Sequence, residues 1–283
     1  MASKAVIPVT YLRPSKGWIG LDLSALWKYR ELVYFLTWRD IKVRYKQAAL
    51  GILWAIIQPV MIMVVFTLIF GNLVNVKTDA SIPQSYYPIF SFAALLPWQL
   101  FQGALQRAGI SLVGNANLLT KVYFPRLIIP IAAVAAGLVD FFFSFLVLVG
   151  LMIYYGVHVT WNILWLIPLI LLSLLTALAV GLWLSALNVR YRDVTQMIPF
   201  LLQAWMYASP VVYSTDLIPS HGLARIVFGL NPMSGVIQGF RWALLGGTPP
   251  DQMMIVSVIM VFVLLISGLY YFRRMERTFA DTI

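Results

Sequence analysis

The feature that most limits what this chain can fold into is a series of long apolar stretches. A helix needs about 20 mostly apolar residues to cross the hydrocarbon core of a bilayer. Six stretches are of about this length: 51–73, 86–106, 127–154, 163–187, 195–213 and 252–272. Asp140 is the one charged residue within them. Charged residues make up 11% of the chain, against about 25% in soluble domains. The sequence therefore predicts an all-α membrane protein with six transmembrane helices.

A segment rich in aromatic and basic residues precedes the first stretch. We expect residues 1–25 to be irregular, without a signal peptide, and residues 26–47 to form a helix. Two neighbouring faces of that helix carry different residues at the same spacing, Trp38, Ile41 and Tyr45 on one and Arg39, Lys42 and Lys46 on the other. This pattern indicates an amphipathic helix in the headgroup plane of the membrane. A solvated charged helix is the alternative.

The basic residues predict the orientation of the chain, because Lys and Arg accumulate in cytoplasmic loops. With the N-terminus in the cytoplasm, all of the 20 Lys and Arg residues lie on that side except Lys77, Arg225 and Arg241. Both termini are therefore predicted to be cytoplasmic. The net charge of +10 then reflects topology and anionic lipid headgroups, and a nucleic-acid partner is not expected. The predicted regions are a cytoplasmic segment (1–47), a transmembrane domain (48–272) and a cytoplasmic tail (273–283).

Two connections between the predicted spans contain further structure. Residues 114–126 are long enough for a short helix along the membrane surface. The last connection holds two apolar pieces, 223–230 and 233–245, which are too short to span and are separated by Asn231 and Pro232. They predict re-entrant helices between spans five and six, an arrangement that needs protein or water to satisfy the backbone. Gly235 and Gly239 are interpreted as helix-packing positions.

The residue types argue against most enzymatic chemistry. The chain has no Cys, which excludes disulfides and thiolate ligands, and it has no phosphate-binding GxxxxGK[ST] loop. Its two histidines, His158 and His221, are far apart in the sequence and predicted on the outer side. No carboxylate pair lies inside a predicted span. We expect no cofactor, metal or catalytic residue on this chain.

Asp140 could serve a transport function, because ionisable residues within spans are costly and commonly functional. The interpretation that we favour is that Asp140 hydrogen-bonds a neighbouring helix or lies nearer the interface. No second charge falls inside a predicted span. This absence argues against a proton relay, and so against a transporter driven by protons or sodium ions.

Two stripes of amide and aromatic side chains are the candidate lining of a substrate path. They comprise Trp98, Gln99, Phe101, Gln102 and Gln106 in the second predicted span, and Phe200, Gln203 and Tyr207 in the fifth. An amide in hydrocarbon is costly unless it meets a helix or water. Aromatic faces beside amides suit sugar rings. Hydrogen bonding between helices explains the same pattern, so both readings remain open.

Four short motifs, in this order, resemble those of one family. They are Leu50-Gly51-Ile52-Leu53-Trp54 leading to Gln58-Pro59, then Asn188-Val189-Arg190-Tyr191-Arg192-Asp193, Ser209-Pro210-Val211 and Asn231-Pro232. The set resembles the ABC-2-type permeases, in particular the branch that exports O-antigen, capsule or teichoic acid. The resemblance covers residues 28–272. It implies a transport permease of the bacterial inner membrane that moves a lipid-linked polysaccharide outward.

The resemblance also implies partners. They are a second copy of this chain, forming a homodimer with the sugar chain passing between the subunits, and two separate ATP-binding subunits that hold ATP and Mg²⁺. The residues implied in contact with the ATPase are Arg39 and Lys42, then Leu118, Lys121, Tyr123 and Arg126 on a main coupling helix over 118–126, and Arg190, Arg192 and Asp193. Simple membrane anchoring explains Lys121 and Arg126 equally well.

The motifs further suggest moving parts. Gly51 and Pro59 are expected to form a hinge between the interfacial helix and the first span. Asn231 and Pro232 are expected in an outer gate. Two other functions stay open: an ABC-2 exporter of drugs or lipids, and a membrane-embedded glycosyl- or phospho-transferase that needs no ATPase partner.

Overall fold

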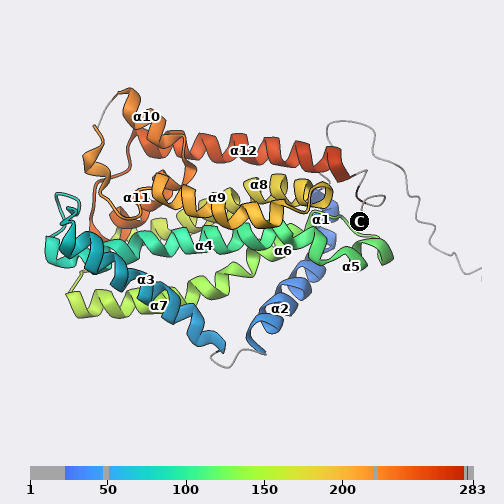
Figure 1. Ribbon diagram of the computed structural model, residues 1–283, viewed down its shortest axis with the longest axis horizontal. Coiled ribbons are helices and arrows are strands. Elements are labelled where there is room, and N and C mark those ends of the chain that lie inside the picture. The colour runs from blue at the N-terminus through green and yellow to red at the C-terminus, as the bar shows by residue number, and fades with distance from the viewer. Residues whose placement is uncertain (1–22, 47–50, 220–221, 277–278, 280–283) are drawn as a thin grey trace, which may run out of the picture.

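The computed structural model describes residues 23–46, 51–219, 222–276 and 279, and over these residues the protein is helical and has no β-strand (Figure 1). The N-terminal helix predicted over 26–47 is present but is divided at Tyr29 into α1 (Leu23–Lys28) and α2 (Arg30–Lys46). The longer helices that follow are α3 (Trp54–Phe66), α4 (Tyr87–Gly114), α6 (Ile128–Ala135), α7 (Gly137–Tyr155), α8 (Leu166–Arg190), α9 (Val194–Ala208), α11 (Pro232–Leu245) and α12 (Gln252–Glu276). The two short helices are α5 (Ala116–Lys121) and α10 (Leu223–Gly229).

Within the part of the chain that the structure describes, four helical stretches are long and apolar enough to cross a membrane: Gly51–Leu73, Ile128–Tyr155, Trp161–Arg190 and Gln252–Glu276. They correspond to the first, third, fourth and sixth predicted spans. A 3₁₀ turn (Gly51–Leu53) and a π-helical segment (Thr67–Leu73) extend α3 at its two ends, and a 3₁₀ turn (Trp161–Trp165) precedes α8. The third stretch changes direction at Ala136, where α6 gives way to α7.

The other two predicted spans depart from expectation. The second lies in α4, which continues to Gly114 and is largely covered by its neighbours. The fifth lies in α9, which has 15 residues. A helix of that length extends about 23 Å, less than the hydrocarbon thickness of about 30 Å. It ends at Ala208 because Ser209 precedes Pro210 and adopts an extended conformation, as residues before proline commonly do.

The bounds predicted for the coupling helix, 118–126, are wrong. The helix is α5, Ala116–Lys121, and the backbone from Val122 to Pro125 is not helical. Pro125 explains the difference, because the residue before a proline disfavours helical geometry. The two short apolar pieces of the last connection form α10 and α11, with Asn231 between them.

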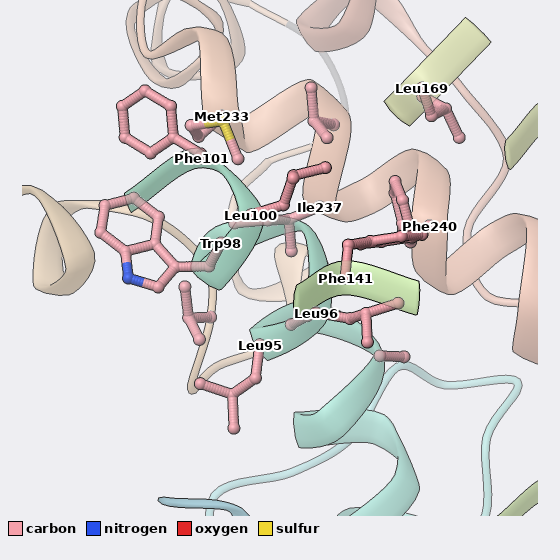
Figure 2. Packing of buried hydrophobic residues seen from close by; sticks show 14 of the residues in the cluster. Leu95, Leu96, Trp98, Leu100, Phe101, Phe141, Leu169, Met233, Ile237 and Phe240 are labelled. Carbon is pink, nitrogen blue, oxygen red and sulfur yellow. The ribbon is translucent and has the colours of Figure 1, made fainter. Parts of the chain in front are cut away.

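The core is built around α4, which runs through the middle of the molecule between α3 and α7 on one side and α8, α9 and α12 on the other (Figure 1). Small residues allow α4 to approach α8 closely, since a Cβ on Gly181 would lie 2.6 Å from that of Ala108. Figure 2 shows Leu95, Leu96, Trp98, Leu100 and Phe101 of α4 packing with Phe141 of α7, Leu169 of α8, and Met233, Ile237 and Phe240 of α11.

The predicted role of Gly235 and Gly239 in packing is confirmed. A Cβ on Gly235 would come within 2.7 Å of Ser257 on α12, and one on Gly239 within 2.7 Å of Leu169 on α8. The two glycines therefore let α11 contact two different helices. Such close approach excludes larger side chains at both positions.

Candidate functional site

A cavity of about 410 Å³ lies among α2, α3, α4 and α7. Its polar lining includes four amides and three charged groups: Gln58, Gln99, Gln102 and Gln106, with Arg44, Arg107 and Asp140. Trp54, Ile62, Leu96 and Phe141 contribute apolar walls. The volume falls in the usual range of ligand pockets, about 300–1,000 Å³. The cavity also contains Gly51 and Pro59, the predicted hinge residues.

Asp140 is the centre of a charged cluster at one end of this cavity. Its Oδ2 accepts hydrogen bonds from Arg44 and, at 3.2 Å, from Arg107, while its Oδ1 accepts one from the Tyr45 hydroxyl. Asp140 therefore has two charged partners, although neither of them falls inside a predicted span. Arg107 follows the predicted second span by one residue, and α4 carries it into the bundle because the helix does not stop there. The interpretation of Asp140 as a hydrogen-bonding partner of neighbouring helices is confirmed.

The Arg107 guanidinium occupies a space left by two glycines. Its Nη1 lies 3.3 Å from where a Cβ on Gly103 would be, and a Cβ on Gly137 would collide with its Nη2. Its Nε donates to the carbonyl of Ala133 at 3.2 Å, one of the last carbonyls of α6, which has no helical partner of its own. Arg107 thus joins α4 to the α6–α7 break as well as to Asp140.

Tyr45 acts as a neutral hydrogen-bond donor in this cluster. Burial, and after it the hydrogen bond to the Asp140 carboxylate, raise the pKa of Tyr45 to about 12. The phenol therefore keeps its proton throughout the physiological pH range. Arg44 and Tyr45 stand at the end of α2, so the cluster ties the N-terminal helix to the bundle.

The glutamine stripe of the second predicted span faces the cavity, and its aromatic neighbours do not. Gln99, Gln102 and Gln106 all line the cavity. Gln102 accepts a hydrogen bond from the Trp98 indole at 2.9 Å, and the buried Nε2 of Gln99 has no partner among the described residues. Trp98 and Phe101 are buried in the core, where Phe101 packs on Trp205 at 5.1 Å between ring centroids. The structure therefore assigns these two aromatics to packing.

The aromatic and amide stripe of α9 lies on the outside of the molecule. Phe200, Gln203 and Tyr207 are all exposed, Phe200 to 77%. None of them lines the cavity. The two predicted stripes therefore do not meet within one chain.

Most of the predicted ATPase-contacting residues belong to α5, the chain just after it and the α8–α9 turn, which lie at one end of the bundle, whereas Arg39 and Lys42 belong to α2 (Figure 1). Lys42, Lys121, Tyr123, Arg190, Arg192 and Asp193 are exposed. Leu118 is partly buried against the core. Arg39 and Arg126 make bonds within the chain, Arg39 to Asp40 and Asn115, and Arg126 to the carbonyl of Glu276. Those two side chains connect the N-terminal helix and α12 to the α4–α6 connection.

Asn231 is the junction between α9, α10 and α11. Its Oδ1 accepts hydrogen bonds from the indole of Trp205 and from the backbone of Met233, the latter as the N-cap of α11. Its Nδ2 donates to Ser209 at 2.8 Å. Pro232 occupies the first turn of α11, where its missing N–H costs nothing. The Asn-Pro and Ser-Pro-Val motifs are therefore in contact.

Sequence reasoning missed two buried arginines at the end of the molecule opposite α5. Arg241 is fully buried, donates to the carbonyls of Pro210, Val211 and Tyr213, and lies over the Phe90 ring. Arg225 pairs with Asp251 at 2.5 Å and donates to the carbonyl of Thr215. Both residues are among the three basic residues that the predicted topology places on the outer side. That exceptional position was the signal in the sequence that these arginines have a structural role. Lys77, the third exception, is exposed.

Comparisons with known proteins agree with the motifs. The family described as ABC-2 type transporter matches residues 31–245. The chain is 31% identical over 261 residues to the O-antigen export system permease protein RfbA of Myxococcus xanthus, covering 91% of this chain and 97% of the relative. It is 28% identical to a protein of the same name from Klebsiella pneumoniae, with 89% and 95% coverage. It is 23% identical to the polysialic acid transport protein KpsM of Escherichia coli, with 74% and 79% coverage.

Proposed function

This chain belongs to the ABC-2 type transporter family, and on that premise we propose that it is the membrane-spanning permease of a polysaccharide exporter. The observation that carries the proposal is the alignment with an O-antigen export permease over nearly the full length of both chains. The substrate is a lipid-linked polysaccharide that moves from the cytoplasmic side outward. The permease contributes the path, and it catalyses no reaction itself.

We propose that the permease crosses the membrane six times. Four of these spans are long apolar helical stretches, and in this proposal α4 and α9 supply the other two, α4 with the length to cross and α9 together with the turn that follows it at residues 209–213. We place α10 and α11 as re-entrant helices on the outer side, since they have only 7 and 14 residues. The basic residues at the α5 end then face the cytoplasm of a bacterium, with both termini on that side of the inner membrane.

ATP hydrolysis in this proposal takes place on two separate ATP-binding subunits, which hold ATP and Mg²⁺. The exposed polar and aromatic residues at the α5 end offer these subunits a docking surface: Lys121 and Tyr123 after α4, and Arg190, Arg192 and Asp193 at the α8–α9 turn. Lys42 on α2 lies at the edge of the same region. Co-purification of a tagged chain with its ATPase tests this arrangement.

The polysaccharide path runs along the boundary between two copies of the chain. The exposed face of α9 with Phe200, Gln203 and Tyr207 supports such a boundary, because lipid hydrocarbon offers no hydrogen-bond partner to the amide of Gln203 or the hydroxyl of Tyr207. The cavity with Gln99, Gln102 and Gln106 supplies further amides on the α3 side of α4. Asn231 and Pro232, which tie the end of α9 to α11, form the outer gate.

Deletion of the gene in its host tests the function. We expect loss of the surface polysaccharide, accumulation of lipid-linked glycan inside the cell, and recovery of export when the wild-type gene is returned. Unchanged surface polysaccharide with impaired efflux of a drug or lipid would contradict the proposal. So would transfer of a sugar or phosphate group by the purified chain without an ATPase.

A further inference from the structure

We propose that Arg44 and Arg107 form a binding site for a phosphate group attached to an apolar chain, and that Asp140 is the internal counter-ion which this phosphate displaces. The inference rests on the proposed function, and it assigns to one cavity the phosphate-bearing part of a lipid-linked substrate. It concerns the cluster at the end of α2 and the cavity beside it.

The cluster has one positive charge that no carboxylate within it balances. Two guanidinium groups share a single carboxylate, and both donate to the same oxygen of Asp140. Each guanidinium has five N–H donors. Among the described residues Arg107 uses Nε and Nη1 and Arg44 uses Nη1, so donors remain on both. Arginine pairs preferentially with phosphate and carboxylate oxygens, which match its fork of donors.

Displacement of Asp140 is energetically accessible. The Arg44 side chain is 51% exposed, so its pair with Asp140 contributes little to stability. The Arg107 side chain is 21% exposed, and its pair with Asp140 is the one whose loss the phosphate has to offset. A phosphate group brings more negative charge than a carboxylate and three acceptor oxygens. Tyr45 keeps its proton and can donate to the incoming anion as it does to Asp140. Exchange of one anion for the other therefore leaves neither arginine unpaired.

The rest of the cavity suits an amphiphile. From the charged end the lining continues with the apolar side chains of Trp54, Ile62 and Phe141, which would contact a hydrocarbon chain. On the α4 side, Gln99 has a buried Nε2 without a partner among the described residues. Such a donor is costly unless a ligand or water satisfies it. A cavity that combines two arginines with apolar side chains suits a phosphate attached to a hydrocarbon chain better than a free inorganic anion, because an inorganic anion would leave the apolar walls without a contact.

The test is ligand binding by the purified full-length chain in nanodiscs of zwitterionic lipid, with octyl phosphate as the probe. Octanol and inorganic phosphate separate the contributions of the chain and of the anion, and tryptophan fluorescence, with Trp54 in the lining, reports binding. We expect octyl phosphate to bind more tightly than either comparison compound. Arg107→Gln and Arg44→Gln should each weaken binding about tenfold, the cost of one charge-assisted contact.

The direction in which Asp140→Asn changes the affinity for octyl phosphate is the decisive result. If Asp140 competes with the phosphate, removing its charge should tighten binding about threefold or more, because a repulsive carboxylate is lost beside the anion. The double variant Arg107→Gln/Asp140→Asn leaves no orphaned carboxylate in the cavity, so it keeps the test valid if Arg107→Gln alone fails to fold. Arg274→Gln, at an exposed arginine of α12 outside the cavity and outside the proposed docking surface, is the matched control and should bind like wild type.

Weaker binding in Asp140→Asn would overturn the proposal, since the cluster would then be a structural tie between α2, α4 and α7. Equal binding of inorganic phosphate would overturn the lipid assignment. An equal loss of binding in Arg274→Gln would show that the probe is attracted non-specifically by positive charge, which would also overturn the proposal. Export by living cells is measured separately. Failure of octyl phosphate binding in a chain that still exports polysaccharide refutes this inference alone, whereas absence of export refutes the proposed function.

Discussion

At the scale of single residues, Arg241 shows how one side chain holds an irregular segment in place. The chain after α9 turns through Pro210, Val211 and Tyr213, whose carbonyls point to the Arg241 guanidinium. A buried carbonyl without a partner costs about 1–3 kcal/mol. The Ser-Pro-Val motif and Arg241, about 30 residues apart along the chain, therefore form a single structural unit.

Arg241→Leu should destabilise the protein by about 3 kcal/mol or more, because several buried carbonyls lose their donor at once. Thermal unfolding of the purified chain measures the effect. Arg190→Leu, which removes an exposed arginine at the other end, should change stability by less than about 0.5 kcal/mol. Equal melting temperatures for the two variants would contradict the role of Arg241.

Gly137 controls the position of Arg107. A Cβ at this position would collide with the guanidinium, and a flexible side chain answers such a collision by moving away. We expect Gly137→Ala to weaken octyl phosphate binding about tenfold, since Arg107 leaves its place beside Asp140, and to lower stability by the loss of that ion pair. Gly150→Ala, in the same helix with open space around it, is the control. Wild-type affinity in Gly137→Ala would contradict this positioning.

At the scale of elements, the predicted hinge residues Gly51 and Pro59 each coincide with a local departure from regular helix. Gly51 has φ of +46°, in the region where residues with a Cβ are strained. Pro59 removes the hydrogen bond that would satisfy the carbonyl of Ala55, and the hydroxyl of Ser144 on α7 donates to that carbonyl at 2.9 Å. The first span is therefore connected to α7 at the position where its own ladder is interrupted.

Gly51→Ala should cost about 1 kcal/mol in strain at this position and should lower the rate of polysaccharide export. The cost arises because alanine does not adopt a positive φ readily, although the space around Gly51 is sufficient. Export in cells and thermal unfolding of the purified chain measure the two effects. Gly150→Ala again serves as control. If Gly51→Ala exports at the wild-type rate, this position does not act as a hinge.

At the scale of the whole molecule, the exposed face of α9 marks the proposed contact between two copies. The absence of native cysteine makes engineered cross-linking unambiguous. Phe200→Cys and Tyr207→Cys should each give a disulfide-linked dimer in oxidised membranes, whereas Ile259→Cys on α12, exposed to 56%, should not. Non-reducing gels of membranes measure this. A dimer through Ile259→Cys without one through α9 would place the boundary on the other side of the molecule.

The sequence by itself determined the class of protein, four of the spans, the family, and the presence of α10 and α11 in the last connection. These follow from local properties, since apolar run length, proline position and short motifs act within a few residues. It also determined that Gln99, Gln102 and Gln106 share one face, because helical periodicity places them there.

Only the tertiary structure decided which of those faces meet. Arg107 became the partner of Asp140 because α4 continues past its apolar stretch and α6 turns into α7 beside Gly103 and Gly137. Trp98 and Phe101 became core residues because their rings pack on each other and Phe101 packs on Trp205 of α9, and Arg241 was buried by a loop about 30 residues earlier in the chain. Such contacts join segments distant in sequence, and their energies depend on the packing of several helices at once. The charged cavity at the end of α2 is the product of that packing.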